Sequence, residues 1–268
     1  MYFVDYHTHS DFSSDSTTPI EENIKQAIAL SLNEIAITDH IDFDYPDPDF
    51  PFLFEYEPYK KQIDFLREKY SDKIKIVLGV EIGLQPHVYE EIGTFISKNH
   101  FDFIIGSTHC VDKLDLYTSD FFNGKTKQDA FFRYFEDVLS NIKNFPNFNV
   151  YGHVDFINRY GNYPDKTMVY SDFKDITDEI LKELISRGKG IELNTSGFRY
   201  GLGHTHPQLD LLKRYKELGG EIITIGSDAH TAKDICYHFD VAYSMLKEAK
   251  FEYLAIFDNQ KPKFIKID

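Results

Sequence analysis

The chain has 268 residues, of which 42% are hydrophobic and 27% charged, enough for a packed core under a normal charged surface. Its formal net charge of −15 disfavours a nucleic-acid partner, and any phosphorylated substrate would need a locally cationic pocket. No apolar run approaches the roughly 20 residues that are needed to span a bilayer, and no basic and then apolar leader follows Met1. Cys110 and Cys236 each lack a nearby second cysteine. We therefore expect a cytoplasmic chain with no membrane partner and two reduced thiols.

Seven short runs rich in β-forming residues recur along the chain, separated by segments with apolar residues at helical spacing. The first run, residues 2–6, is followed by a loop over 7–17 and a helix expected to begin at Thr18-Pro19. The other predicted strands are residues 34–38, 74–80, 101–107, 148–152, 190–194 and 221–226. The KFIKI run, residues 263–267, is expected to form a short closing strand.

This alternation predicts an α/β fold in which parallel strands are joined by right-handed helical crossovers, as an open doubly wound sheet or a closed barrel. We favour a seven-stranded (β/α)7 barrel similar to a TIM barrel. It is expected to be a single domain over residues 1–268, since no linker, repeat or low-complexity tract divides the chain. Two long loops, residues 42–58 and 111–127, are predicted to be functional lids at one face.

Residue types that bind metals follow nearly every predicted strand. The C-terminal strand ends of a barrel meet around one mouth, so we expect these residues to converge. His7 and His9 are two apart, which in an extended strand turns both imidazoles to one side, and Asp228 and His230 repeat this spacing. The segments are His7-Thr8-His9, Thr38-Asp39-His40, Glu81, Ser107-Thr108-His109, His153-Val154-Asp155 and Ser227-Asp228-Ala229-His230.

Glu81 ends a very apolar strand, where an ionised carboxylate is costly unless a cation compensates it. A carboxylate that bridges two metal ions would meet this need. His40, His109 and His153, taken one at a time, would more often be structural histidines than ligands. Together these residues supply nitrogen and oxygen donors, which suit zinc, iron or manganese better than calcium or magnesium.

The loop after the sixth strand would hang over the same mouth and carries His204, His206 and Arg199, while the loop after the fifth strand carries Arg159. A guanidinium grips phosphate oxygens through two parallel hydrogen bonds, so both arginines are candidate substrate clamps. Either one could instead be an ordinary surface arginine. The histidines that fall away from strand ends are assigned to solvated faces: His87, His100 and His238.

These motifs, in this order and over nearly the whole chain, resemble the polymerase-and-histidinol-phosphatase (PHP) family of metallohydrolases. The segments that carry the resemblance are His7-Thr8-His9, Thr38-Asp39-His40, Gly79-Val80-Glu81, Ser107-Thr108-His109, Gly152-His153 and Gly226-Ser227-Asp228-Ala229-His230. The stretches GHVDFINR and ELNTSGFR look most like the family members that act on histidinol phosphate.

The resemblance implies a distorted seven-stranded barrel that holds two or three divalent transition-metal ions. Many relatives place a histidine in the first loop, whereas this chain has Asp15 there, and a carboxylate is a harder ligand than imidazole. Transferred motif by motif, one ion would take His7, His9, Glu81 and Asp228, a second Glu81, His109 and His153, and a third His40, His230 and Asp15.

The expected reaction is hydrolysis of L-histidinol phosphate to L-histidinol and phosphate. A hydroxide that bridges two ions would attack phosphorus, since coordination lowers the pKa of water from ~15.7 to near ~7. Arg159 or Arg199 would offset the developing charge, and Asp39 or His204 would protonate the leaving alcohol. Three loop aromatics could stack on the substrate imidazole or pack within the lid: Phe43, Phe50 and Phe52.

Three alternatives stay open at this point. The substrate could be another small phosphate ester, such as a nucleotide, a sugar phosphate or phosphotyrosine. The chain could be an amidohydrolase-type deaminase, although such enzymes often use a metal-bridging lysine where Glu81 stands. It could also be a metal-dependent accessory barrel without activity, which the full ligand set disfavours.

Overall fold

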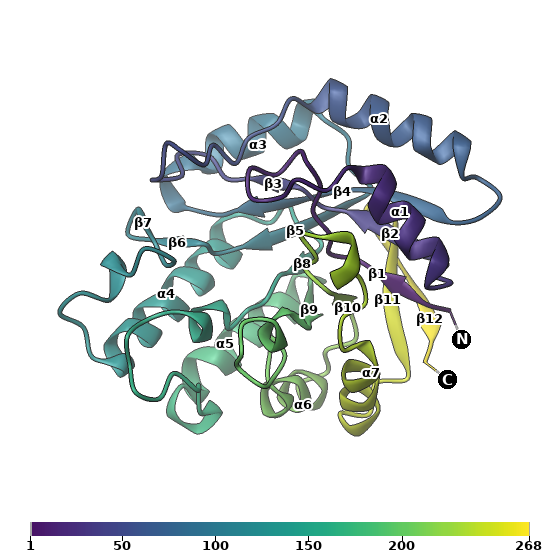
Figure 1. Ribbon diagram of the computed structural model, residues 1–268. Helices are drawn as coiled ribbons and strands as arrows, with labels where there is room; N and C mark the ends of the chain where they lie inside the picture. Colours follow the sequence, from purple (N-terminus) through teal and green to yellow (C-terminus); the bar gives the residue numbers. More distant parts are fainter. Residues whose placement is uncertain (1, 268) are drawn as a thin grey trace.

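The computed structural model describes residues 2–267 and shows a nearly closed barrel of seven parallel strands ringed by helices (Figure 1). The predicted α/β barrel is therefore confirmed. Each predicted strand coincides with an observed one, in the sheet order β1 (Val4–Asp5), β2 (Glu34–Ile37), β4 (Lys75–Gly83), β5 (Phe103–Ser107), β8 (Val150–Tyr151), β9 (Gly190–Asn194) and β10 (Ile223–Gly226).

The barrel closes where the first strand segment meets the last. The Tyr6 amide donates to the Ile225 carbonyl at 2.9 Å, and the Asp228 amide donates to the His7 carbonyl at 2.8 Å. Because these bonds continue beyond the short strand β1, His7 and Asp228 are held side by side by backbone before any side chain interacts.

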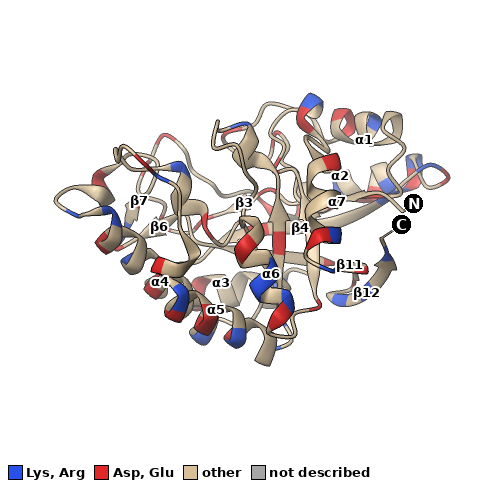
Figure 2. Ribbon diagram, turned by 90° about the horizontal axis from the view of Figure 1, so that it is seen from below, with Lys and Arg blue, Asp and Glu red and all other residues tan. Residues whose placement is uncertain are grey.

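The helices lie on the outside of the strands, and one continuous hydrophobic core fills the space between them. Their charged residues appear along the outer helices in Figure 2. The first helix begins at Ile20, just after the predicted start, and buries Ile24 and Ala27. The helices are α1 (Ile20–Ala29), α2 (Tyr56–Lys69), α3 (Tyr89–Lys98), α4 (Lys127–Asn144), α5 (Lys174–Ser186), α6 (Leu209–Glu217) and α7 (Phe239–Glu248).

Strand β4 is longer than predicted, and this places Glu81 within it rather than after its end. The short strand β3 (His40–Ile41) pairs in parallel with the end of β4, which puts His40 opposite Glu81. The extra strand therefore sets one metal-binding residue beside another through backbone register.

The long loop over residues 111–127 contains a small hairpin, β6 (Cys110–Val111) and β7 (Leu114–Asp115). The KFIKI run does form a strand, as predicted, but that strand does not close the barrel. β11 (Tyr253–Asp258) and β12 (Lys261–Lys266) form an antiparallel hairpin outside the barrel, because β1 and β10 already bond to each other.

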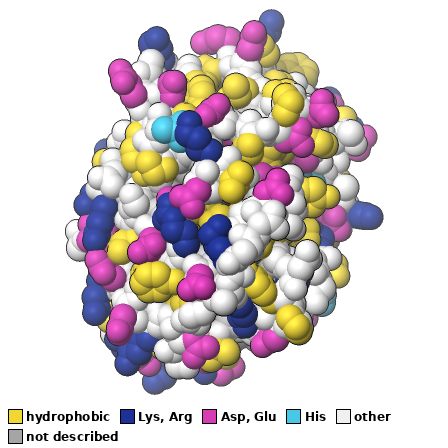
Figure 3. Space-filling view, turned by 90° about the vertical axis from the view of Figure 1, so that its left-hand side faces the viewer, with side chains coloured by type: hydrophobic (Ala, Val, Ile, Leu, Met, Phe, Trp, Pro, Cys, Tyr) yellow, Lys and Arg dark blue, Asp and Glu magenta, His cyan; other side chains and the backbone are white. Residues whose placement is uncertain are grey.

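The surface carries both signs of charge. On the face shown in Figure 3, acidic and basic side chains are mixed with hydrophobic ones rather than gathered by sign. Within residues 2–267, none of the helices has the length and apolar character that crossing a membrane requires.

Candidate metal centre

The nine residues predicted as metal ligands all lie around the C-terminal ends of the barrel strands. Their ligand atoms form three clusters that could each hold an ion. The clusters are His7, His9 and Glu81; Glu81, His109 and His153; and His9, His40 and His230. The barrel therefore brings together segments that are more than 200 residues apart in sequence.

Glu81 is the centre of the arrangement and is fully buried. Its Oε2 lies 3.1 Å from His7 Nε2, while its Oε1 lies 2.8 Å from His153 Nε2. Burial opposes ionisation of this carboxyl, but the imidazoles around it, His7 first, then His109 and His40, hold its pKa well below its usual range. Each oxygen of an ionised Glu81 thus faces a different set of nitrogen donors, as a bridging carboxylate requires.

The first donor group contains His7, His9, Glu81 and Asp228. The two histidine Nε2 atoms are 3.0 Å apart, and Asp228 Oδ1 lies 3.4 Å from His9 Nε2 and 3.8 Å from His7 Nε2. Donors bound tetrahedrally to zinc at about 2.1 Å would be roughly 3.4 Å apart, so these spacings suit one shared ion.

The second donor group adds His109 and His153 to the other side of Glu81. His109 Nε2 lies 3.3 Å from Glu81 Oε1. Both rings are largely buried, and the His153 Nδ1 atom has no hydrogen-bond partner among the described residues. The Nε2 atoms of both histidines thus converge on one oxygen of Glu81, at 2.8 Å for His153 and 3.3 Å for His109, as two imidazole ligands and a carboxylate around one ion would.

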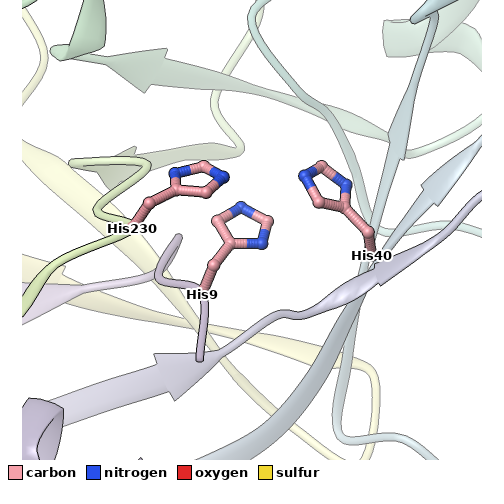
Figure 4. Close-up of side chains that lie close together, drawn as sticks. All are labelled: His9, His40 and His230. Carbon is pink, nitrogen blue, oxygen red and sulfur yellow. The ribbon is translucent and has the colours of Figure 1, made fainter. Parts of the chain in front are cut away.

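The third donor group is more open to solvent. Figure 4 shows the rings of His40, His230 and His9 converging, and the His9 ring stacks on both others with centroids 4.2 Å and 4.1 Å away. Asp15 Oδ2 lies 3.0 Å from His230 Nε2 and 3.8 Å from His40 Nε2. Since His9 Nε2 points to the first group, Asp15 is the available third donor for an ion at this position.

Arg159 is a buried cation that contacts Asp228 of the first donor group. Its Nη2 donates to Asp228 Oδ2 at 2.9 Å, and its guanidinium lies between the rings of Phe156 and Tyr200, 4.5 Å and 4.3 Å from their centroids. Burial opposes the charge, but Asp228 raises the pKa of the guanidinium further above its usual value. Arg159 is therefore a fixed, permanent cation at the cavity wall.

Arg199 has a different role in this structure. It donates to the backbone carbonyls of Ser227 at 2.7 Å and Asp228 at 2.5 Å. Asp228 adopts a left-handed backbone conformation with φ of 56°, which is uncommon for a residue other than glycine. Arg199 thus stabilises the turn that aims Asp228 at the histidines, besides lining the cavity.

All three donor groups open into one cavity of about 410 Å³, which Arg159 and Arg199 also line. Phe50 and Phe52 of the long loop lie in its wall as well, and the Phe52 ring is 5.0 Å from that of His40. Phe43 does not line this cavity and packs instead against Phe95 of α3. The cavity thus combines metal donors, a fixed cation and aromatic rings.

The model of the PHP domain family matches residues 5–196. The chain belongs to the PHP family. It is 37% identical to the histidinol-phosphatase of Lactococcus lactis, covering 97% of this chain and 96% of that protein. It is 23% identical to the histidinol-phosphatase of Saccharomyces cerevisiae over 96% of this chain and 92% of that one. The crystal structure of the L. lactis histidinol phosphate phosphatase, complexed with zinc, L-histidinol and phosphate, matches with a TM-score of 0.92, covering 97% and 98% of the two chains.

In this PHP domain, neither residue predicted as a general acid lines the cavity. Asp39 is fully buried and accepts bonds from the Ser10 amide at 2.6 Å and the Ser13 hydroxyl at 2.7 Å. His204 turns its Nδ1 to the neighbouring Thr205 carbonyl at 2.8 Å. Neither position supports the predicted role, because a general acid must reach the leaving oxygen. Asp39 instead holds the first loop in place.

His206, whose role the sequence left open, is fully buried in the PHP domain. Its Nδ1 pairs with Asp155 at 2.7 Å, and its Nε2 accepts a bond from Arg159 Nε at 3.3 Å. Burial lowers the pKa of His206 to about 4, so the ring is neutral at neutral pH and free to accept that bond. The other three histidines are exposed as predicted: His87, His100 and His238.

Two buried carboxylates that sequence reasoning missed orient the proposed ligands. Glu192 Oε1 lies 2.7 Å from His7 Nδ1, and Asp42 Oδ2 lies 2.6 Å from His109 Nδ1. Such partners fix which ring nitrogen faces the metal. A Cβ at Gly226 would collide with Glu192 and His7, so glycine is needed where the two meet. Like Glu81, Glu192 is a single acidic residue in an apolar strand, and the same sequence pattern could have identified it.

Proposed function

We propose that this chain is a metal-dependent phosphomonoesterase that hydrolyses L-histidinol phosphate to L-histidinol and phosphate. The observation that carries the proposal is Glu81, whose two carboxylate oxygens face different imidazole groups on the floor of a cavity that also holds a buried arginine. The similarity to histidinol-phosphatases over nearly the full length supports the choice of substrate.

The donor set fits divalent transition metals. His7, His9, Glu81 and Asp228 would hold one ion, and Glu81, His109 and His153 a second, at donor spacings of 2.8–3.8 Å. His40, His230 and Asp15 would hold a third. When bound, such ions act as Lewis acids and lower the pKa of coordinated water toward neutrality.

The protein contributes geometry and charge to this reaction. Glu192 and Asp42 accept the Nδ1 protons of His7 and His109, which leaves the Nε2 lone pairs free for the site. Arg159 is already held between two rings, so its guanidinium can bind the phosphate oxygens with little loss of side-chain entropy. The buried floor excludes bulk water and strengthens each of these interactions.

The test is a steady-state assay of metal-loaded protein on L-histidinol phosphate and on a panel of nucleotides, sugar phosphates and phenyl phosphate. We expect kcat/KM for L-histidinol phosphate to exceed the others by at least about tenfold, the discrimination that one or two matched contacts supply. Equal turnover across the panel would refute the substrate and leave a general phosphoesterase.

Glu81→Ala separates catalysis from a purely structural metal centre. It should abolish hydrolysis while the circular dichroism spectrum stays that of the wild type. Loss of the folded spectrum would instead favour an accessory barrel held together by its ions.

A further inference from the structure

The hydrogen bonds of Arg159 leave one nitrogen of its guanidinium free. Nε donates to His206 Nε2 at 3.3 Å, while Nη2 donates to Asp228 Oδ2 at 2.9 Å and to the Ser196 hydroxyl. These bonds use the single N–H of Nε and both N–H groups of Nη2. Within residues 2–267, Nη1 donates no hydrogen bond, and Arg159 lines the cavity. Nη1 is therefore the nitrogen that the protein leaves available to a phosphate group.

Two kinds of contact orient this guanidinium. It stacks between the rings of Phe156 and Tyr200, which fixes its plane but not its rotation within that plane. The hydrogen bonds that lie in the plane set the rotation. The bonds to Asp228 and Ser196 belong to the metal centre, since the Ser196 hydroxyl lies 3.0 Å from Asp228 Oδ2. The bond to His206 is made outside the three donor groups, so it does not depend on how bound ions draw on Asp228.

His206 can accept this bond because of its partner on the other side of the ring. Asp155 Oδ1 lies 2.7 Å from His206 Nδ1, and both residues are fully buried. Because the carboxylate takes the Nδ1 proton, a neutral ring must carry its lone pair on Nε2, which faces Arg159 Nε. The opposite tautomer would set two N–H groups against each other. Asp155 Oδ2 also accepts the Asn158 side-chain amide at 3.0 Å, which keeps the carboxylate in place.

The backbone anchors His206 independently of the cavity. Its amide donates to the Asn194 carbonyl at 2.8 Å, and the Asn194 amide donates to the His206 carbonyl at 2.7 Å. Asn194 ends strand β9, whereas Arg159 ends the short 3-10 helix Phe156–Arg159 that follows β8. The bond between His206 and Arg159 thus ties the loop after β9 to the loop after β8 at the point where the guanidinium lines the cavity.

We propose that His206, oriented by Asp155, is a positioning residue that fixes the rotation of the Arg159 guanidinium and so aims Nη1 at the substrate phosphate. This inference rests on the proposed function and deepens it, because it explains how the phosphate-binding arginine is held. His206 is fully buried and does not line the cavity, so it acts through Arg159 and does not touch the substrate.

The direct test is the dissociation constant of inorganic phosphate for the metal-loaded protein, measured by isothermal titration calorimetry. His206→Asn can still donate to Asp155 but is too short to reach Arg159. We expect it to bind phosphate about tenfold more weakly, the effect of losing about one net hydrogen bond. His206→Leu fills the space of the ring without an acceptor and should show the same loss. His206→Gln offers a carbonyl oxygen to Arg159 Nε and should stay within about threefold of wild type.

A double-mutant cycle with Arg159→Lys separates positioning from a general effect on the fold. Lysine has no Nε–H for His206 to orient, so in this background His206→Asn should weaken phosphate binding no further. Thr177→Val is the control for the loss of a buried hydrogen bond, because the Thr177 hydroxyl donates to the Phe173 carbonyl in α5 at 2.9 Å. That variant should lower thermal stability and leave the dissociation constant of phosphate unchanged.

Three outcomes would overturn the inference while the proposed function stands. They are wild-type phosphate affinity in His206→Asn and His206→Leu, an equal loss in His206→Gln, and an undiminished loss in the Arg159→Lys background. If the metal-loaded wild type binds no phosphate, the proposed function fails first, and the positioning role fails with it.

Discussion

Glu192→Gln should weaken metal binding although this residue would touch no ion. Glu192 accepts the His7 Nδ1 proton at 2.7 Å through Oε1, and its Oε2 accepts the His153 amide at 3.0 Å and the Asn194 side chain at 3.1 Å. A glutamine there has only one acceptor oxygen. If the glutamine oxygen faces His7, its NH2 group points at the His153 amide and the Asn194 side chain, which are both donors. If the side chain is flipped, its NH2 group donates to His7 Nδ1, and His7 must then carry its own proton on Nε2.

Either arrangement disturbs the lone pair that His7 directs toward Glu81 and His9. Loss of such a carboxylate partner typically costs 10- to 100-fold in metal affinity, which corresponds to about 1.4–2.7 kcal/mol. The assay is competition with a chromophoric chelator for the metal at fixed pH, followed by elemental analysis. We expect affinity to fall in this range, with kcat recovered in part at high metal concentration.

Glu34→Gln is the matched control. Glu34 is also a buried glutamate on a barrel strand, but it bonds Tyr6 and Lys75 away from the donor groups. That variant should lower thermal stability and leave metal affinity unchanged. Equal metal affinity in Glu192→Gln and wild type would refute the view that the carboxylate sets the His7 tautomer.

Three further predictions concern the third ion, the phosphate clamp and acid stability. Asp15→Asn should reduce bound metal by one ion per chain in elemental analysis, while ions held through Glu81 remain. Arg159→Lys should weaken inhibition by inorganic phosphate and lower kcat/KM about 100-fold, because lysine cannot replace the planar guanidinium, which stacks between two rings and bonds Asp228. The pKa of buried His206 is lowered to about 4, so the unfolded chain binds the proton more tightly and the free energy of unfolding should fall, by up to about 3 kcal/mol, as pH drops from 6.5 to 4. Denaturant titrations should show a smaller fall for His206→Gln.

The candidate ligands were predictable because each follows or ends a strand, and the ends of parallel strands must meet in a barrel. His7, His9 and Asp228 were predicted from their spacing taken together with the metal-binding residues at the other strand ends. Glu192 obeyed the same logic as Glu81 and could have been found, since both are single acids in apolar strands. Asp42 stands two residues after His40, the spacing used for His7 and His9, and was overlooked for the same reason.

Residue types and their order along the chain determined the fold class, the family and the donor set, because hydrophobic periodicity and ligand chemistry are local properties. Tertiary structure alone decided the direction of each side chain. It buried Asp39 against the first loop, turned the His204 ring toward the Thr205 carbonyl, and bonded Arg199 to the backbone of the turn after β10.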